Sequence, residues 1–357
     1  MNCSNADRKL EHIEISLKED VEGPLTTWLE CVHLIHNAVP ELNISEVDTS
    51  VTFLGKKLSA PLIISGMTGG APSTEKINAE LAKVVEALGL GLGVGSQRSA
   101  IECEHLKHTF NVVRSYAPKS LVIANIGIYE FIKYDLGMIE KVVNMVEADA
   151  LAVHLNVVQE LTQPEGSHDF RGFLNKLKEV SRVLPVPIII KEVGFGLSKD
   201  VASVIGGAGV NYFDVAGAGG TNWAKIELLR ARRKGDRIKE YMALELLRWG
   251  IPTAASIVEV RTALPSAGII ASGGIRGALD VVKSIRLGAD VAGMALPILK
   301  AYYRGELMEY LRGLINSIKA ILLLTGSRNV NELKTKPVVI YDPLRTWIIQ
   351  RNLKVIM

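Results

Sequence analysis

The segment from Ala150 to Glu160 joins an apolar run to a cluster of polar side chains. Successive side chains of a strand point to opposite faces, so His154 and Asn156 would share one face with two alanines. Gln159 and Glu160 follow directly, where a loop could carry amide and carboxylate chemistry. The alternative is a strand followed by an ordinary helix, with Glu160 placed to suit the helix dipole. This segment alone leaves both interpretations open.

Seven further apolar runs share this organisation, each followed by glycine or polar residues and then by a helix-like segment. The eight runs are 61–65, 90–96, 121–127, 150–156, 187–193, 212–217, 268–274 and 289–295. Such runs, alternating with amphipathic helices, indicate an α/β protein with a parallel sheet, and eight units predict a closed (β/α)8 TIM barrel. A doubly wound sheet is the rival fold, but no GxGxxG motif opens the first unit.

We expect one domain over residues 1–357. Residues 1–60 would form an N-terminal extension, in which a hairpin at 52–58 plugs the barrel's N-terminal mouth. The barrel would span 61–325, followed by a C-terminal helical tail at 326–357. A charged insertion after strand six, at 222–266, predicts extra helices.

The ends of strands seven and eight are rich in glycine. These loops are the usual phosphate site of such barrels, because backbone N–H groups and a helix N-terminus converge there. Ser272-Gly273-Gly274 and Gly293-Met294-Ala295 occupy the two positions. Glycine allows a phosphate to approach the backbone closely. One Gly-Gly pair would equally suit a tight turn, but the two matching loops favour a phosphate site.

Lys191 ends a run of isoleucines, so its stem should be buried and its ammonium group needs an anionic or electron-rich partner. It could be a Schiff-base nucleophile or face the edge of a flavin; the alternative is a lysine that reaches solvent. Neutral hydrogen-bonding groups at other strand ends suit a planar heterocycle, although each alone is equally a turn residue. They are Thr68, Ser96, Asn125 and Thr221.

Three charged features point to an anionic substrate. Arg98 follows the second strand, and Arg8, Lys9 and His12 form a basic cluster that could also be a solvated tail. Glu160 could hold Mg²⁺ only if waters and substrate phosphates complete its coordination.

The overall charge is nearly balanced, with 41 basic and 38 acidic residues, so it argues against nucleic acid or a membrane surface as a partner. The three cysteines have no metal-ligand spacing. The charged N-terminal segment is unlike a signal peptide, and we expect a cytoplasmic protein.

Together these residues resemble the type 2 isopentenyl-diphosphate isomerases, which use FMN and Mg²⁺. The resemblance runs in order through nearly the whole chain. Its motifs are RKxEH at 8–12, SGMTGG at 65–70, SQRS at 96–99, HLNxxQE at 154–160, TNW at 221–223 and SGGIR at 272–276. HLNxxQE is the most specific, and Val157-Val158 stands where common members have Pro-Leu.

The resemblance implies a role for each group of residues. The substrate diphosphate and alkene would meet Arg8, Lys9, His12, Ser96, Gln97, Arg98, Ser99, His154, Asn156 and Gln159. FMN would contact Ser65, Gly66, Met67, Thr68, Ser96, Asn125, Lys191, Ala216 and Thr221, and its phosphate Gly273, Gly274, Ile275, Met294 and Ala295. Gln159, His154 and Lys191 would be catalytic, and Glu160 would bind Mg²⁺.

The implied reaction converts isopentenyl to dimethylallyl diphosphate in isoprenoid biosynthesis, without net redox change. The sequence offers no convincing pair of carboxylates, so reduced FMN would act as acid and base while the protein orients the substrate. NAD(P)H would be the reductant. The family also implies a homo-oligomer, a tetramer or octamer.

The strongest rival is an FMN-dependent oxidoreductase of the 2-hydroxy-acid oxidase type. That chemistry needs a histidine base after strand six, and the GGTNW segment at 219–223 contains none. A non-catalytic flavin- or phosphate-binding barrel is the second alternative. It would need neither HLNxxQE nor the N-terminal basic cluster.

Overall fold

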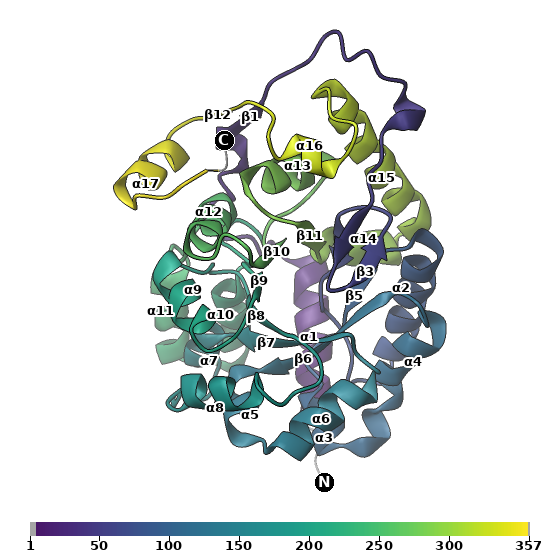
Figure 1. Ribbon diagram of the computed structural model, residues 1–357. Helices are drawn as coiled ribbons and strands as arrows, with labels where there is room; N and C mark the ends of the chain where they lie inside the picture. The colour runs from purple at the N-terminus through teal and green to yellow at the C-terminus, as the bar shows by residue number, and fades with distance from the viewer. Residues whose placement is uncertain (1–4, 356–357) are drawn as a thin grey trace.

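Eight parallel strands close into a barrel in the computed structural model, which describes residues 5–355 (Figure 1). They pair in chain order around the barrel, and the last strand pairs with the first. They are β4 (Leu62–Ile64), β5 (Gly91–Gly93), β6 (Leu121–Gly127), β7 (Ala150–Leu155), β8 (Ile188–Glu192), β9 (Tyr212–Asp214), β10 (Gly268–Ala271) and β11 (Val291–Met294). Each lies within one of the eight predicted runs, and the (β/α)8 fold is confirmed.

Helices surround the barrel because the strands are apolar on both faces. In β7, Leu151 and Val153 belong to the cluster shared with the helices, whereas Ala150 and Ala152 face the barrel interior. The covering helices are α2 (Thr74–Leu88), α4 (His108–Tyr116), α6 (Leu136–Met145), α8 (Phe173–Val180), α9 (Lys199–Gly206), α12 (Thr253–Ala263), α13 (Ala278–Leu287), α14 (Leu296–Tyr303) and α15 (Leu307–Leu324).

A hairpin of β2 (Val51–Phe53) and β3 (Lys56–Leu58) packs against one end of the barrel interior. Phe53 and Leu58 join the inward-facing cluster, and the Phe53 ring meets Tyr212 edge-on at 5.8 Å between centroids. Tyr212 begins β9, so the hairpin lies at the N-terminal ends of the strands.

The opposite end carries short helices in the strand-to-helix loops. They are α3 (Arg98–Glu102), α5 (Ile128–Lys133) and α7 (Val157–Thr162). After β9, the chain forms α10 (Trp223–Lys234) and α11 (Arg237–Leu246) before α12 resumes the outer ring, so the predicted insertion is helical. Helix α1 (Asn5–Lys18) packs against α10.

The two extensions pair with each other. Strand β1 (Val32–Leu34) lies antiparallel to β12 (Val338–Ile340), and the tail adds α16 (Val330–Leu333) and α17 (Leu344–Gln350). Figure 1 shows the two chain ends on opposite sides of the molecule, with the C-terminal end near β1 and β12. Among residues 5–355, no helix combines the length and apolar character that a membrane crossing requires.

Candidate active site

A cavity of about 260 Å³ lies at the carboxyl ends of the barrel strands, where barrels of this fold carry their active sites. All eight strand-end loops and helix α1 contribute to its lining. The predicted residues that it brings together are Arg8, Lys9, His12, Ser65, Gly66, Met67, Thr68, Ser96, Arg98, Asn125, His154, Asn156, Gln159, Glu160, Lys191, Ala216, Thr221, Gly273, Gly274, Ile275 and Ala295.

Three predicted residues do not line this cavity: Gln97, Ser99 and Met294, all of them buried. The Gln97 amide donates to the Val142 carbonyl at 2.8 Å and accepts from the Asn125 backbone N–H at 2.9 Å. Both ends of its side chain are therefore committed within the protein. The expected substrate contact of Gln97 does not agree with this geometry, and its observed role is to hold Asn125 in place.

The ammonium group of Lys9 reaches from α1 into the loops after β4 and β5. It donates to the carbonyl oxygens of Gly69 and Ser96, the latter at 2.6 Å, and to the Ser99 hydroxyl at 3.1 Å. These acceptors favour the charged form, but burial, and next the neighbouring Arg8, lower the pKa of Lys9 to about 7. Ser99 thus contributes indirectly, by holding Lys9.

His154 is neutral in this environment. Its Nδ1 lies 2.9 Å from Asn125 Oδ1, an acceptor, so Nδ1 carries the proton and Nε2 is left as an acceptor. Burial, and then the positive charges of Lys191 and Lys9, lower the pKa of His154 to about 3. The residue therefore adds no positive charge to the cavity.

Lys191 projects from β8 into the barrel, as expected, and forms an ion pair with Asp214. Its Nζ donates to Asp214 Oδ2 at 2.8 Å and to Ser272 Oγ at 3.4 Å. The Ser272 hydroxyl also donates to Asp214 Oδ1 at 2.5 Å. These contacts fix the ammonium group at the cavity wall. The adjacent Glu192 points elsewhere and accepts three backbone N–H groups of residues 193–195.

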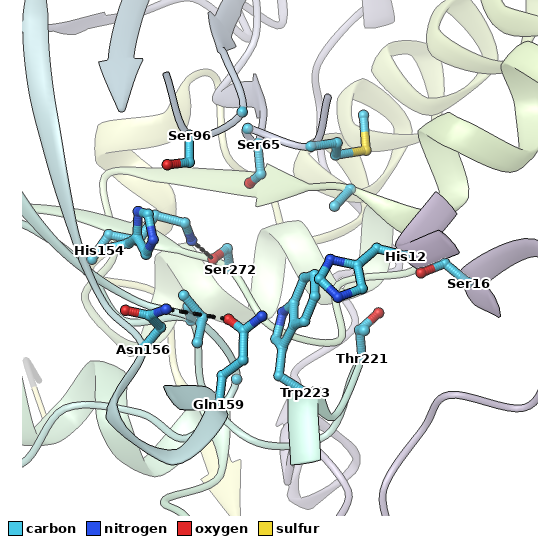
Figure 2. Close-up of a pocket in the computed structure, with 18 of the residues that line it drawn as sticks. His12, Ser16, Ser65, Ser96, His154, Asn156, Gln159, Thr221, Trp223 and Ser272 are labelled. Atoms are coloured by element: carbon cyan, nitrogen blue, oxygen red, sulfur yellow. Dashed lines mark hydrogen bonds between the residues drawn. The ribbon is translucent and has the colours of Figure 1, made fainter. Parts of the chain in front are cut away.

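The path through Val157 and Val158 brings the two following polar residues to the cavity. Helix α7 starts at Val157, and Val158 packs against Phe195 and Ala224. With Val158 anchored, Gln159 and Glu160 both line the cavity. Figure 2 shows the amides of Asn156 and Gln159 facing each other, with Nδ2 and Oε1 3.4 Å apart.

Arg98 is held by two carboxylates. Its Nε donates to Glu102 at 2.6 Å and its Nη1 to Glu130 at 2.8 Å. Burial raises the pKa of Glu130, which also lines the cavity, although Arg98 opposes that shift. Arg8, by contrast, forms no ion pair with the side chains that the structure describes, those of residues 8–355.

The loops after β4 and β10 suit a flavin ring and its phosphate. The Ser65 hydroxyl is buried without a hydrogen-bond partner in the described chain, although it lines the cavity. Gly273 and Gly274 have φ of 92° and 75°, backbone conformations that favour glycine. A Cβ on Gly274 would lie 2.4 Å from the Gly219 carbonyl oxygen, so this turn is held tightly against its neighbour. The orphaned Ser65 hydroxyl and the Gly273–Gly274 turn both line the cavity, and both fit a polar cofactor there.

The carboxylate of Glu160 has a setting that suits a shared metal ion. Its Oε1 accepts from Asn156 Nδ2 at 2.9 Å, and its Oε2 from the Ser167 backbone N–H at 2.7 Å. Among the described side chains, residues 8–355, no cluster of three or more His, Cys, Asp or Glu could hold a metal ion. A cation at Glu160 would therefore need ligands from the substrate and water, as Mg²⁺ commonly does.

Sequence reasoning missed several residues that shape the site: Glu130, Asp214, Trp223, Glu227 and Arg230. Trp223 stands within the TNW motif, and its ring meets His12 edge-on at 5.1 Å between centroids (Figure 2). Glu227 and Arg230 follow at spacings of four and three, which place all three on one face of α10. The spacing indicates a shared helix face, but it does not indicate that this face is buried.

Sequence comparison places the chain among known flavin-dependent proteins. Residues 140–340 match the model of the FMN-dependent dehydrogenase family. Proteins named isopentenyl-diphosphate delta-isomerase are similar over nearly their whole length. The relative from Ignicoccus hospitalis is 51% identical, covering 99% of this chain and 98% of its own, and that from Sulfurisphaera tokodaii is 48% identical, covering 99% and 96%.

Solved structures with the same fold are FMN-barrel oxidases of low sequence identity. A lactate oxidase of Pediococcus acidilactici superposes with a TM-score of 0.67 at 13% identity, covering 95% of this chain and 93% of its own. A mandelate oxidase variant with an FMN adduct gives 0.63 at 14% identity, covering 88% and 90%. These two likenesses concern the fold alone. By the sequence identity of its relatives and the match over residues 140–340, the chain belongs to the isopentenyl-diphosphate delta-isomerases, within the FMN-dependent dehydrogenase family.

Proposed function

We propose that this protein isomerises isopentenyl diphosphate to dimethylallyl diphosphate with FMN and Mg²⁺. One observation carries the proposal: the basic residues of α1 and the polar end of β7 meet in one cavity. His12 of α1 and Gln159 of α7 even bind the same carboxylate oxygen, Oε1 of Glu227.

The diphosphate is assigned to the side of the cavity below α1. Arg8 and Lys9 have no carboxylate partner among the described residues, so an anion there would meet uncompensated positive charge. Binding would also favour protonation of Lys9, which burial opposes in the free protein. Arg98 is already paired with two carboxylates, so it adds little net positive charge to the cavity. We assign it to orienting the bound anion.

FMN is assigned to the loops after β4 and β10 and to the inner ends of β6 and β8. Ser65, Gly66, Thr68 and Asn125 would hold the ring system, and Lys191 would face it from β8. The backbone of Gly273 and its neighbours would hold the phosphate. Reduced FMN, when bound, supplies the acid and base that the reaction needs.

The chain's own residues orient the substrate and its metal ion. Gln159 would lie beside the alkene and hold it against the flavin face. Glu160 would bind Mg²⁺, with the diphosphate and water as further ligands. His154, neutral with Nδ1 committed to Asn125, offers Nε2 as an acceptor to a protonated group of the substrate.

A product assay tests the proposal directly. FMN-loaded protein, reduced under anaerobic conditions, is incubated with isopentenyl diphosphate and Mg²⁺, and the methyl signals of dimethylallyl diphosphate are followed by proton NMR. We expect product under reduced conditions and little with oxidised flavin. If reduced, Mg²⁺-supplied protein forms no product, the isomerase assignment is wrong.

The oxidase alternative has less support. Thr221 and Trp223 occupy the cavity wall after β9, where the oxidase chemistry requires a histidine. Turnover of lactate or glycolate in the same preparation would reverse this preference.

The remaining assignments concern cellular context. NAD(P)H is proposed to reduce the flavin without being consumed in each turnover, and the protein is proposed to be a cytoplasmic homo-oligomer, a tetramer or octamer. Spectral reduction by NADH or NADPH, and light scattering of the purified protein, test these two points.

A further inference from the structure

A fully buried glutamate, Glu227 of α10, connects three parts of the active site. Its Oε1 accepts from His12 Nε2 at 3.1 Å and from Gln159 Nε2 at 3.3 Å. Its Oε2 accepts from Arg230 Nη1 at 2.6 Å. One carboxylate therefore binds His12 of α1, Gln159 of α7 and Arg230 of its own helix.

Arg230 extends this set of contacts to two further segments. The side chain is 1% exposed, and its Nε donates to Glu11 of α1 at 2.9 Å. Its Nη2 donates to Glu165, in the loop after α7, at 2.8 Å. A guanidinium group is planar with fixed donor directions, so three carboxylates around it are placed relative to one another. We call Glu227 and Arg230 together the Glu227–Arg230 hub.

The hub determines which way the Gln159 amide points. An ionised carboxylate only accepts hydrogen bonds, so Gln159 must present its NH₂ group to Glu227. Its Oε1 then faces Asn156 Nδ2 and the cavity as an acceptor. Burial acts to raise the pKa of Glu227, but its bonds to His12 and Arg230 outweigh that effect and keep the pKa lowered.

Docking of α1 and orientation of Gln159 use the same two side chains. Glu11 and His12 attach α1 to Arg230 and Glu227, and Gln159 attaches to the same Glu227 oxygen as His12. From this geometry we propose that the Glu227–Arg230 hub is a positioning device that couples the docking of α1 to the amide orientation of Gln159. The inference rests on the proposed function for its catalytic meaning, but the coupling itself is testable without turnover.

Hydrogen–deuterium exchange of the FMN-loaded protein measures the coupling, with inorganic pyrophosphate as the probe. In the wild type, pyrophosphate should slow amide exchange both in residues 8–18 and in residues 157–162. In Arg230→Met, exchange of both segments should be at least tenfold faster without ligand, and pyrophosphate should no longer protect 157–162. The matched control is Arg232→Met on the same helix, a half-exposed arginine paired with Glu240, which should behave like the wild type.

Two results would overturn the coupling: Arg230→Met loosens residues 8–18 while 157–162 exchange as in the wild type, or it changes neither segment. If Arg230→Met does not fold, Glu227→Gln takes its place, because it keeps the size of the side chain and can still bond to Arg230. The same paired acceleration is then expected, and acceleration of one segment alone again contradicts the proposal.

Kinetics separate this inference from the proposed function. In Glu227→Gln, the residue-227 amide can donate as well as accept, so Gln159 loses its single orientation. We expect kcat for isopentenyl diphosphate to fall at least tenfold, and KM to rise as well because α1, which carries Arg8 and Lys9, is held less firmly. A higher KM with unchanged kcat would show that Glu227 holds α1 without orienting Gln159, which contradicts the coupling. Absence of isomerisation in the wild type would defeat the proposed function while leaving the exchange result to judge the coupling.

Discussion

The ammonium group of Lys191 lies 2.8 Å from the carboxylate of Asp214 on the neighbouring strand, and the Ser272 hydroxyl of the next strand donates to the same carboxylate. Three adjacent strand ends thus hold one another through a single ion pair below the cavity. The pair is mostly shielded from water, with 14% and 6% of the two side chains exposed.

Removing the acidic partner should therefore destabilise the protein. Asp214→Asn leaves the Lys191 ammonium buried without its counter-ion, and we expect the free energy of unfolding to fall by roughly 3 kcal/mol. Guanidinium chloride unfolding of the flavin-free protein measures it. Glu80→Gln, which breaks an exposed pair with Lys83, is the control and should change stability by less than about 0.5 kcal/mol. Equal changes in the free energy of unfolding for the two variants would show that the buried Lys191–Asp214 pair stabilises the protein no more than an exposed pair does.

Anion binding should weaken as the pH rises through neutrality. The pKa of Lys9 is lowered from 10.5 to about 7, so above pH 7 the free protein holds an amine that must take up a proton to bind an anion well. The association constant for inorganic pyrophosphate should then fall by up to about tenfold per pH unit above pH 7. Calorimetric titrations between pH 6 and 9 measure the slope.

Lys9→Arg provides the control for this pH dependence. Arginine stays charged over the whole range, so the slope that remains in this variant reports the ionisation of pyrophosphate and of other groups. The wild type should show the steeper fall. Identical slopes would mean that Lys9 does not take up the proton.

The same lowered pKa makes the contribution of Lys9 to stability rise between about pH 7 and 10.5, because the unfolded chain holds the proton there and the folded chain does not.

Truncating the alkene-side amide should affect turnover and leave the flavin bound. Gln159→Ala removes the group that orients the substrate, and we expect kcat to fall by roughly 100-fold or more. Product formation is measured by proton NMR, and flavin content by absorbance. Gln350→Ala, on the exposed face of α17, is the control and should match the wild type. Loss of FMN from Gln159→Ala would instead assign this residue to the cofactor.

Neutralising the proposed metal ligand should change the metal requirement. Glu160→Gln keeps the size of the side chain and removes its charge, so the Mg²⁺ concentration that gives half-maximal activity should rise at least about tenfold. Activity titrations with Mg²⁺ measure this concentration. Glu306→Gln serves as the exposed control. An unchanged Mg²⁺ titration in Glu160→Gln would place the metal ion elsewhere.

The sequence predicted the barrel well because its strands carry their own signal. Strands buried on both faces appear in the sequence as apolar runs, and the alternation of side chains alone predicts His154 on the inner face. Gln97 is a residue for which the alternation of side chains gives no prediction. It stands between two residues that reach the cavity, but beyond β5 the backbone turns, and alternation no longer tells which side chain points inward.

The hub was not predictable from local pattern. Glu227 and Arg230 belong to a charged stretch that is typical of a solvated helix, and they are buried because α1 and α7, both distant in sequence, pack against α10. Asp214 and Glu130 likewise acquire a role only through partners on other strands and loops. Tertiary pairing of charges leaves no periodic trace in one sequence.

The placement of α1 also affects how the protein should be handled in the laboratory. The described chain begins on the helix that borders the cavity, whereas Lys354 donates its backbone N–H to Thr262 at the far end of α12. Figure 1 shows these ends on opposite sides of the molecule. A purification tag, fluorescent fusion or surface tether therefore belongs at the C-terminal end, since an addition in front of α1 would be joined to the helix that carries Arg8, Lys9 and His12.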